Sequence, residues 1–235
     1  MSAITKAQLF LLDIIAHNDW VRPIYFSITS GQESYMGLEK YLFQEGMAYH
    51  LLPINANSKD GYTGEVNTEV MYNNFMNKFQ WGNMNDPKVY LDETNLRLAK
   101  NLRGIVSGRL ATYLLYENKK DSAIRVLDKA MIEMPENKVP YDIFIIPIIE
   151  GYLKADAIDK ATPIMKRTAD VAIEYLNYIY SLPDKKHRLL AVEKQQYLFM
   201  LQSMLRFADE YQINDITDTY MKQFEHFYQL YATRG

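Results

Sequence analysis

The chain contains no cysteine among its 235 residues, and this absence excludes several kinds of chemistry at once. Disulfides, thiolate metal sites and cysteine nucleophiles all require that residue. Charge of one sign is also missing, because 26 basic residues face 29 acidic ones. A formal net charge of −3 gives no bulk electrostatic attraction to nucleic acid or to anionic lipid, so we expect no nucleic-acid partner.

Long hydrophobic runs are missing as well. The longest, Ile143 to Ile149, is interrupted by Pro147, whereas a bilayer span needs about 20 apolar residues. The first fifteen residues contain a single lysine and an internal Asp13, and they lack the basic start and cleavage site of a signal peptide. We therefore expect the chain as given to be soluble.

What is abundant is aromatic and aliphatic side chains. Hydrophobic residues make up 48% of the chain and charged residues 23%, and there are 19 Tyr and 10 Phe but only 10 Gly. These proportions are typical of a folded globular protein of one or two domains. We predict a mainly α fold (α+β) with two parts, residues 1–91 and residues 92–235.

The first part shows mixed periodicity. Apolar spacing predicts a helix over residues 5–17, and β-branched and aromatic residues predict strands over 24–29 and 47–54. A short helix is expected over residues 37–43, and the turn-forming sequence NANSKDGYTG over 55–64 is the clearest loop. We expect the two strands to pair as a β-hairpin, which makes residues 1–91 an α+β subdomain.

The second part is helical in period. A helix capped by Asn67 or Thr68 comes before this part, and a long helix is predicted over residues 92–117. Further helices are expected near 121–134, 141–154, 157–181, 184–210 and 214–232.

A weak repeat lies within these helices. Its small and apolar residues have the offsets of a tetratricopeptide helical hairpin, and a proline closes the unit. The positions are Leu110, Ala111, Leu114, Ala123, Leu127, Ala130 and Pro135. We therefore predict a tetratricopeptide-like helical domain over residues 92–235. An irregular helical bundle is the alternative, because it has the same amphipathic period.

Motifs for catalysis are almost absent. The four histidines are distant in sequence, and no pair has the four-residue spacing that presents two imidazoles to one metal ion. The chain has no phosphate-binding glycine loop, no dinucleotide-binding glycine motif and no nucleophile elbow. We expect no catalytic residue, no cofactor and no metal site in this chain.

The most unusual local sequence runs from Asn18 to Phe26. Its residues Asp19, Trp20, Arg22 and Tyr25 are candidate binding residues, because a guanidinium beside an indole and a phenol can stack or bind a carboxylate or phosphate. In the structural alternative, Trp20 fills the core and Arg22 pairs with Asp19. Trp81, in a loop, is a further candidate with the same two interpretations.

The segment LLDIIAHNDWVRPIYF, residues 11–26, also resembles a recurrent segment of one bacterial protein family. Its members are multi-spanning membrane proteins of unknown function, related to protein O-mannosyltransferases and other C-type glycosyltransferases. Further short blocks continue the resemblance to about residue 180, and they include EGMAY at 45–49, VNT at 66–68, MYNN at 71–74, NKFQWG at 77–82 and PKVYLDE at 87–93.

The resemblance implies a C-terminal, extracytoplasmic (periplasmic) domain of a larger membrane protein. The membrane spans and the acidic catalytic loop of such enzymes have no counterpart in this chain, so it would carry no catalytic residue of its own. Its partner would be a protein or peptide, and its contact with the membrane would come through preceding spans of the parent protein. The oligomeric state is not indicated.

Three hypotheses follow. The first is a non-catalytic accessory domain of a membrane glycosyltransferase-like protein, which positions an acceptor or a partner. The second is a free-standing helical-repeat adaptor that binds peptides. The third is an enzyme whose site gathers Asp19, Arg22, Glu45 and His50.

Overall fold

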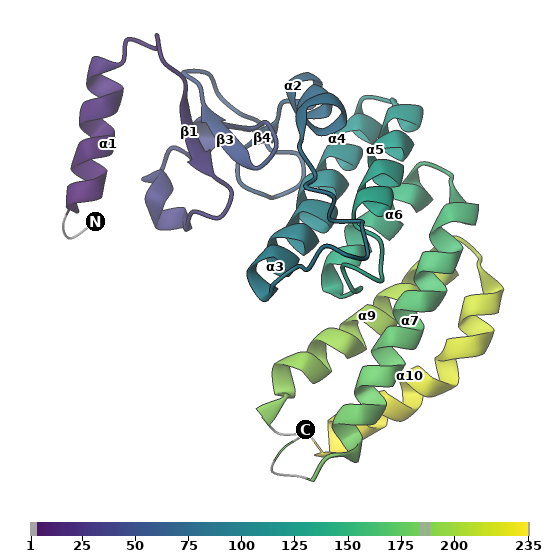
Figure 1. Ribbon diagram of the computed structural model, residues 1–235. Helices are drawn as coiled ribbons and strands as arrows, with labels where there is room; N and C mark the ends of the chain where they lie inside the picture. Colours follow the sequence, from purple (N-terminus) through teal and green to yellow (C-terminus); the bar gives the residue numbers. More distant parts are fainter. Residues whose placement is uncertain (1–3, 184–185, 187–188, 235) are drawn as a thin grey trace. The chain divides into compact units, whose positions relative to one another are not determined.

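The computed structural model describes residues 4–183, 186 and 189–234 (Figure 1). The fold class is confirmed, because a small four-stranded sheet near the N-terminus precedes an array of helices. The chain divides into two compact units, residues 1–79 (unit 1) and residues 80–235 (unit 2). The loop 80–91 therefore groups with the helices of unit 2, whereas the sequence places the boundary between residues 91 and 92.

Unit 1 begins with helix α1, Lys6–His17, which Thr5 and Gln8 close with a reciprocal capping box. The strands of its sheet follow the order β1-β3-β2-β4. Their bounds are β1 Ile24–Ser27, β2 Leu42–Gln44, β3 Ala48–Leu51 and β4 Glu65–Val66. β3 pairs antiparallel with β1 and with β2, while β4 lies parallel to β2.

Two expectations for unit 1 need correction. The predicted strands do pair, with Ile24 opposite Leu51, but the hairpin is formed by β2 and β3. The helix predicted over 37–43 is wrong: a single 3-10 turn, η2 (Glu39–Tyr41), leads directly into β2. Leu42 is fully buried in this strand, and burial against the sheet outweighs the local helical pattern.

The core of unit 1 is small. Tyr35, which belongs to the 3-10 turn η1 (Gln32–Tyr35), packs with Leu42, Tyr49 and Leu51, and α1 adds only the partly buried Ile15 to this cluster. Helix α2, Thr68–Asn73, starts at the predicted cap Asn67 and continues as the π-helical turn η3, Asn74–Lys78. The buried side chains of this last segment are Met71 and Phe75.

Unit 2 contains the predicted helices. The helix expected over 92–117 is continuous but consists of α3, a π-helical segment η4, and α4. The bounds are α3 Glu93–Asn101, η4 Leu102–Ser107, α4 Gly108–Tyr116, α5 Lys120–Glu133, η5 Ile143–Ile145 (3-10), α6 Ile146–Lys154, α7 Ile158–Ser181, α9 Ala191–Glu210 and α10 Asn214–Arg234. Of the helix expected over 184–210, α9 (Ala191–Glu210) forms the main part, and residues 184, 185, 187 and 188 lie outside the described residues.

Consecutive helices of unit 2 pack in pairs, α4 with α5, α6 with α7 and α9 with α10. α7 also packs along α9, so the three long helices α7, α9 and α10 lie side by side (Figure 1). Ala111, Ala123, Ala130 and Ala161 are fully buried, and these small side chains allow the helices to approach closely. The array is confirmed, whereas its assignment as tetratricopeptide-like stays a prediction.

Candidate functional site

A polar groove lies beside helix α3 in unit 2. Its main hollow has a volume of about 550 Å³, and a second hollow of about 260 Å³ adjoins it, because Leu96 lines both. We call the two together the α3 groove. Its lining residues are Pro87, Lys88, Val89, Tyr90, Leu91, Glu93, Thr94, Leu96, Arg97, Lys100, Asn137, Lys138, Asp142 and Phe144.

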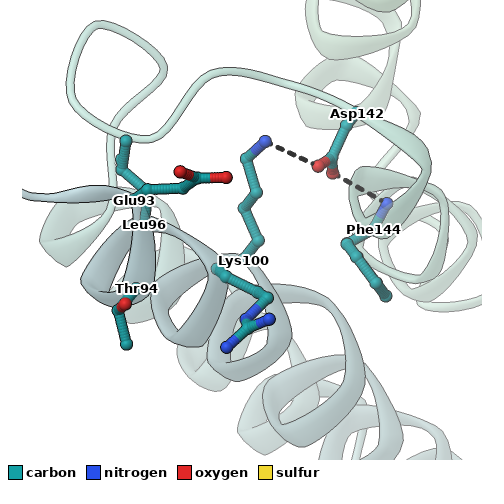
Figure 2. A pocket seen from close by; sticks show the side chains of 7 residues that line it. Glu93, Thr94, Leu96, Lys100, Asp142 and Phe144 are labelled. Carbon is teal, nitrogen blue, oxygen red and sulfur yellow. Dashed lines mark hydrogen bonds and ion pairs between the residues drawn. The ribbon is translucent and has the colours of Figure 1, made fainter.

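Local sequence places the two walls of the main hollow. Asp92 caps α3 by accepting a hydrogen bond from the backbone N–H of Asn95 (2.8 Å). Arg97 and Lys100 follow on the same helix and line the main hollow. Asp142 caps η5 in the same way, by accepting from the backbone N–H of Phe144 (3.0 Å). Figure 2 shows the Lys100 side chain extending from α3 toward Asp142. Their ion pair, 2.8 Å long, ties the walls together.

The wall that carries Asp142 is fixed from below by a buried arginine. Arg103, in η4, has no solvent exposure, and its guanidinium donates to the backbone carbonyls of Met134 (3.0 Å), Val139 (2.6 Å) and Pro140 (3.1 Å). Burial lowers the pKa of Arg103 from its ordinary value, while nearby Tyr141 and Asp142 oppose that change. The segment that leads into η5 is thus held by charge-assisted hydrogen bonds to backbone rather than by a salt bridge.

Gly104 allows the two walls to come this close. A Cβ atom at this position would lie 2.1 Å from the carbonyl oxygen of Phe144, which is closer than any real contact. Gly104 belongs to the π-helical segment, and such segments widen a helix locally. The close approach of η4 to η5 places Phe144 at the groove.

The other end of the α3 groove is held by a lysine. Lys138 donates through Nζ to the carbonyls of Pro87 (3.4 Å) and Val89, which holds the loop 87–91 against the segment after α5. Lys88 and Arg97, by contrast, are exposed and form no hydrogen bond or ion pair through their side-chain nitrogens with any part of the chain that is described. The groove thus has four basic side chains, Lys88, Arg97, Lys100 and Lys138, and two acidic ones, Glu93 and Asp142.

Unit 1 holds a second polar cluster, around Glu45. Its carboxylate accepts hydrogen bonds from Tyr25 Oη (3.0 Å) and Asn67 Nδ2 (3.1 Å), and it lies 3.2 Å from His50 Nδ1. The rings of Tyr25 and His50 stack at a centroid distance of 4.5 Å. Burial and the hydrogen bond to Glu45 raise the pKa of Tyr25 above its ordinary value, which keeps the phenol protonated.

This cluster differs from the site that an enzyme would need. Glu45 and His50 are brought together, but no hydrogen bond or ion pair among the described residues joins Asp19 or Arg22 to them. Both carboxylate oxygens of Glu45 already have partners, so the cluster ties the sheet to the loop before α2. Such an arrangement stabilises the sheet.

The sequence candidates near residue 20 lie at a surface corner. Asp19 and Trp20 both have positive φ, at 47° and 58°, so the chain turns sharply after α1. Trp20 is 47% exposed, so it does not fill the core, and it lines a shallow hollow of about 260 Å³ in unit 1 with Ile15 and Tyr41. Arg22 is exposed and, among the residues described, forms no ion pair with Asp19.

The remaining two candidates are Tyr25 and Trp81. Tyr25 is half-exposed on β1 and bonds to Glu45. Trp81 belongs to unit 2, where the Nζ of Lys129 lies 5.7 Å from its ring centroid, a cation–π contact. The five candidates are thus divided between the two units.

Sequence reasoning did not find the residues of the α3 groove. One signal was available: Glu93, Arg97 and Lys100 have the three- and four-residue spacings that place side chains on one helical face. Asp142 and Phe144 had no such signal, because only the tertiary fold brings η5 to α3.

Helix α1 presents a different kind of surface. None of its residues is buried, and its exposed side chains include Leu9 (55%), Phe10 (69%), Leu12 (44%) and Ile14 (51%). Val21, just beyond the helix, is 81% exposed. We call these residues, with Ile4 and Trp20, the α1 surface. Several exposed large apolar side chains on one short helix are typical of an interaction site.

Membrane-spanning helices and metal-binding clusters are both absent from the described residues. In residues 4–183, 186 and 189–234, no helix has the length and apolar character to cross a bilayer. The same part of the chain contains no group of three or more His, Asp or Glu side chains placed to hold a metal ion.

Comparison with known proteins gave one match. Neither the search of curated proteins nor the search of solved structures found a similar protein. Residues 1–70 match the family model of TMEM260-associated domain 2. The matched segment contains α1 and all four strands of the sheet, and it lies entirely within unit 1.

Proposed function

We propose that this chain is a non-catalytic accessory domain of a larger membrane protein of the glycosyltransferase-like class, and that it works by contacting a protein partner. The observation that carries the proposal is the α1 surface. Its large apolar side chains are exposed to water when the chain is alone.

The exposed apolar area of α1 supports this proposal. Phe10 and Ile14 are four residues apart and Leu9 and Leu12 three apart, so each pair shares a helical face, and apolar side chains are exposed on two separate faces of α1. A helix of 12 residues is marginally stable in water without packing, and α1 packs on the sheet only through Ile15. Covering the α1 surface would remove this unfavourable exposure.

The family comparison supports the same proposal. The matching model describes a domain associated with TMEM260, which is a candidate protein O-mannosyltransferase. The match includes α1, so the similar region is also the region with the uncovered surface. We propose further that the parent is a multi-spanning membrane protein, that the domain lies on its extracytoplasmic side, and that unit 2 is a tetratricopeptide-like array.

The polar clusters favour a role without catalysis. Glu45 has hydrogen-bond partners on both oxygens, and Asp142 is engaged by Lys100 and by a backbone N–H. Both carboxylates are therefore engaged in contacts that hold the local structure together.

The experiment begins with the complete coding frame that contains this sequence. We expect a frame with many apolar segments of about 20 residues, and we expect its product to fractionate with membranes. A photo-crosslinking residue at position 10 should then join unit 1 to the membrane-embedded part of the same polypeptide. The matched control is position 69, an exposed glutamate of α2 in unit 1 that lies outside the α1 surface.

Two results would contradict the proposal. A frame that encodes no apolar segment of that length removes the membrane parent. Equal crosslinking from positions 10 and 69, at background level, removes the α1 surface as the contact.

A second function is supported by the α3 groove. A free-standing adaptor that binds peptides would use this groove and would need no membrane parent. The coding frame separates the two, because an adaptor requires a product without membrane segments.

A further inference from the structure

Three properties of the α3 groove indicate the kind of molecule that it can bind. It is concave, it holds more basic than acidic side chains, and it has apolar walls at Leu96 and Phe144. The chain as a whole carries a formal charge of −3, so the excess of basic side chains in the groove is local.

We propose that the α3 groove binds an extended acidic peptide segment that carries one aromatic or large aliphatic side chain. The inference rests on the proposed function as a protein-interaction domain, and it names the chemistry of the partner. The charge, the shape and the rigidity of the groove each support this proposal.

Charge complementarity selects an acidic occupant. Arg97 and Lys88 are exposed and have no acidic partner in the described part of the chain, so each can donate hydrogen bonds to a carboxylate without breaking an existing bond. Asp142 is already neutralised by Lys100, at 2.8 Å. Glu93 lies in the first turn of α3, where the helix dipole stabilises its charge. The groove is left with unpaired positive charge, and a guanidinium binds a carboxylate in two-point fashion.

Shape selects a peptide with a large apolar side chain. The main hollow, of about 550 Å³, is lined by Leu96 on α3 and by Phe144 on η5. Figure 2 shows these two residues on its opposite walls, with the Lys100–Asp142 pair between the walls. The second hollow continues past Leu96 to Tyr90, which is 87% exposed. A groove built from two adjoining hollows suits an extended chain.

The groove is also preorganised. Arg103 fixes the segment before η5 from below, Gly104 sets the distance between η4 and η5, and Lys138 fixes the loop 87–91. A preformed groove loses little conformational freedom when a peptide binds, and the affinity is greater for that reason.

The test uses the full chain and a short fluorescein-labelled peptide of alternating glutamate and serine with one central phenylalanine. Fluorescence anisotropy at low and raised salt gives the dissociation constant. We expect saturable binding that weakens as salt increases, because exposed ion pairs are screened. A peptide with glutamine in place of glutamate, and another with serine in place of phenylalanine, should each bind at least about tenfold more weakly.

Charge reversal in the protein provides the matched pair of variants. Arg97→Glu removes a groove cation, whereas Lys222→Glu makes the same change in charge at an exposed residue of α10 that does not line the groove. We expect Arg97→Glu to weaken binding about tenfold or more and Lys222→Glu to leave it unchanged. Circular dichroism and thermal melting of both variants establish that they fold.

Three outcomes overturn the proposal: no saturable binding up to about millimolar peptide, equal weakening by both charge reversals, or equal affinity for the glutamate and glutamine peptides. These outcomes are separate from the test of the proposed function. Crosslinking from position 10 can succeed when the peptide does not bind, and the loss then falls on the α3 groove alone.

Discussion

The two units of the chain stabilise themselves in different ways. Unit 2 buries side chains along every helix from α4 to α10, whereas unit 1 relies on a short sheet and on a small set of buried hydrophobic residues. That set comprises Tyr35, Leu42, Tyr49, Leu51, Val66, Met71 and Phe75. Helix α1 adds none. Apolar residues thus make a core in unit 2, and many of those in unit 1 remain at the surface, where they are available to a partner.

The largest effect that we expect concerns the buried arginine of unit 2. Arg103→Ala should lower the free energy of unfolding by about 3–5 kcal/mol, because three backbone carbonyls lose a charged donor and a large cavity opens. Urea denaturation of the full chain measures it. The control Arg97→Ala, at an exposed position, should change stability by no more than about 0.5 kcal/mol. Similar losses for both variants would show that Arg103 does not fix the core of unit 2.

The next effect concerns the contact between η4 and η5. Gly104→Ala should cost about 2 kcal/mol or more, because its Cβ would lie 2.1 Å from a backbone oxygen that cannot move alone. Gly151→Ala is the matched control, since its Cβ would meet a flexible Leu127 methyl at 3.0 Å. We expect a cost below about 1 kcal/mol there, because the side chain can shift and alanine favours the helix. Thermal melting of both variants decides the point, and equal melting temperatures would contradict it.

Alkaline pH should destabilise unit 2 through its buried tyrosines. Burial and the hydrogen bond to Asp128, 2.9 Å long, raise the pKa of Tyr152 above its ordinary value. The folded state therefore favours the neutral phenol. Its contribution is fully present below about pH 10 and is lost as the pH rises above that value.

The variant Tyr152→Phe isolates this contribution. It should cost about 1 kcal/mol at pH 8 or below, through the lost hydrogen bond, and it should lose less stability than the parent chain between about pH 9 and about pH 11. Urea denaturation at each pH is the measurement. An identical pH dependence for both proteins would exclude Tyr152 as a contributor.

The smallest expected effect lies in α1, and it sharpens the comparison between the units most directly. Replacing both Leu9 and Phe10 by Gln should change the stability of the isolated chain by no more than about 0.5 kcal/mol, because both side chains are uncovered. Ile15→Gln should cost more, since Ile15 packs on the sheet core. Thermal melting compares the two. A large loss for the double variant would show that α1 already has a covering partner within the chain.

Hydrophobic period was sufficient to predict most of unit 2. The spacing of residues 110–130 predicted two closely packed helices, and Ala111, Ala123 and Ala130 are fully buried between them. In unit 1 the same reasoning was less successful. The segment 37–43 has a short helical pattern, yet Leu42 becomes part of a strand because β3 offers it backbone partners and a buried position. Strand pairing depends on residues distant in sequence, and a local pattern does not contain it.

The candidate sites follow the same division. The sequence singled out Asp19, Trp20, Arg22, Tyr25 and Trp81, which are unusual by residue type, and the structure distributes them between two units. The α3 groove consists of ordinary lysines, arginines and aspartates, and it becomes a site only because η5 returns to α3.

By itself, the sequence determined the composition, the absence of thiol chemistry, the near-neutral charge and the helical period of residues 92–235. These are properties of single residues and of local spacing. The tertiary structure alone decided that α1 stays uncovered, that Glu45 gathers Tyr25, His50 and Asn67, and that Arg97 and Phe144 line one groove. Each of these depends on contacts between segments far apart in the chain, whose geometry is set by packing and by close backbone approach, as at Gly104.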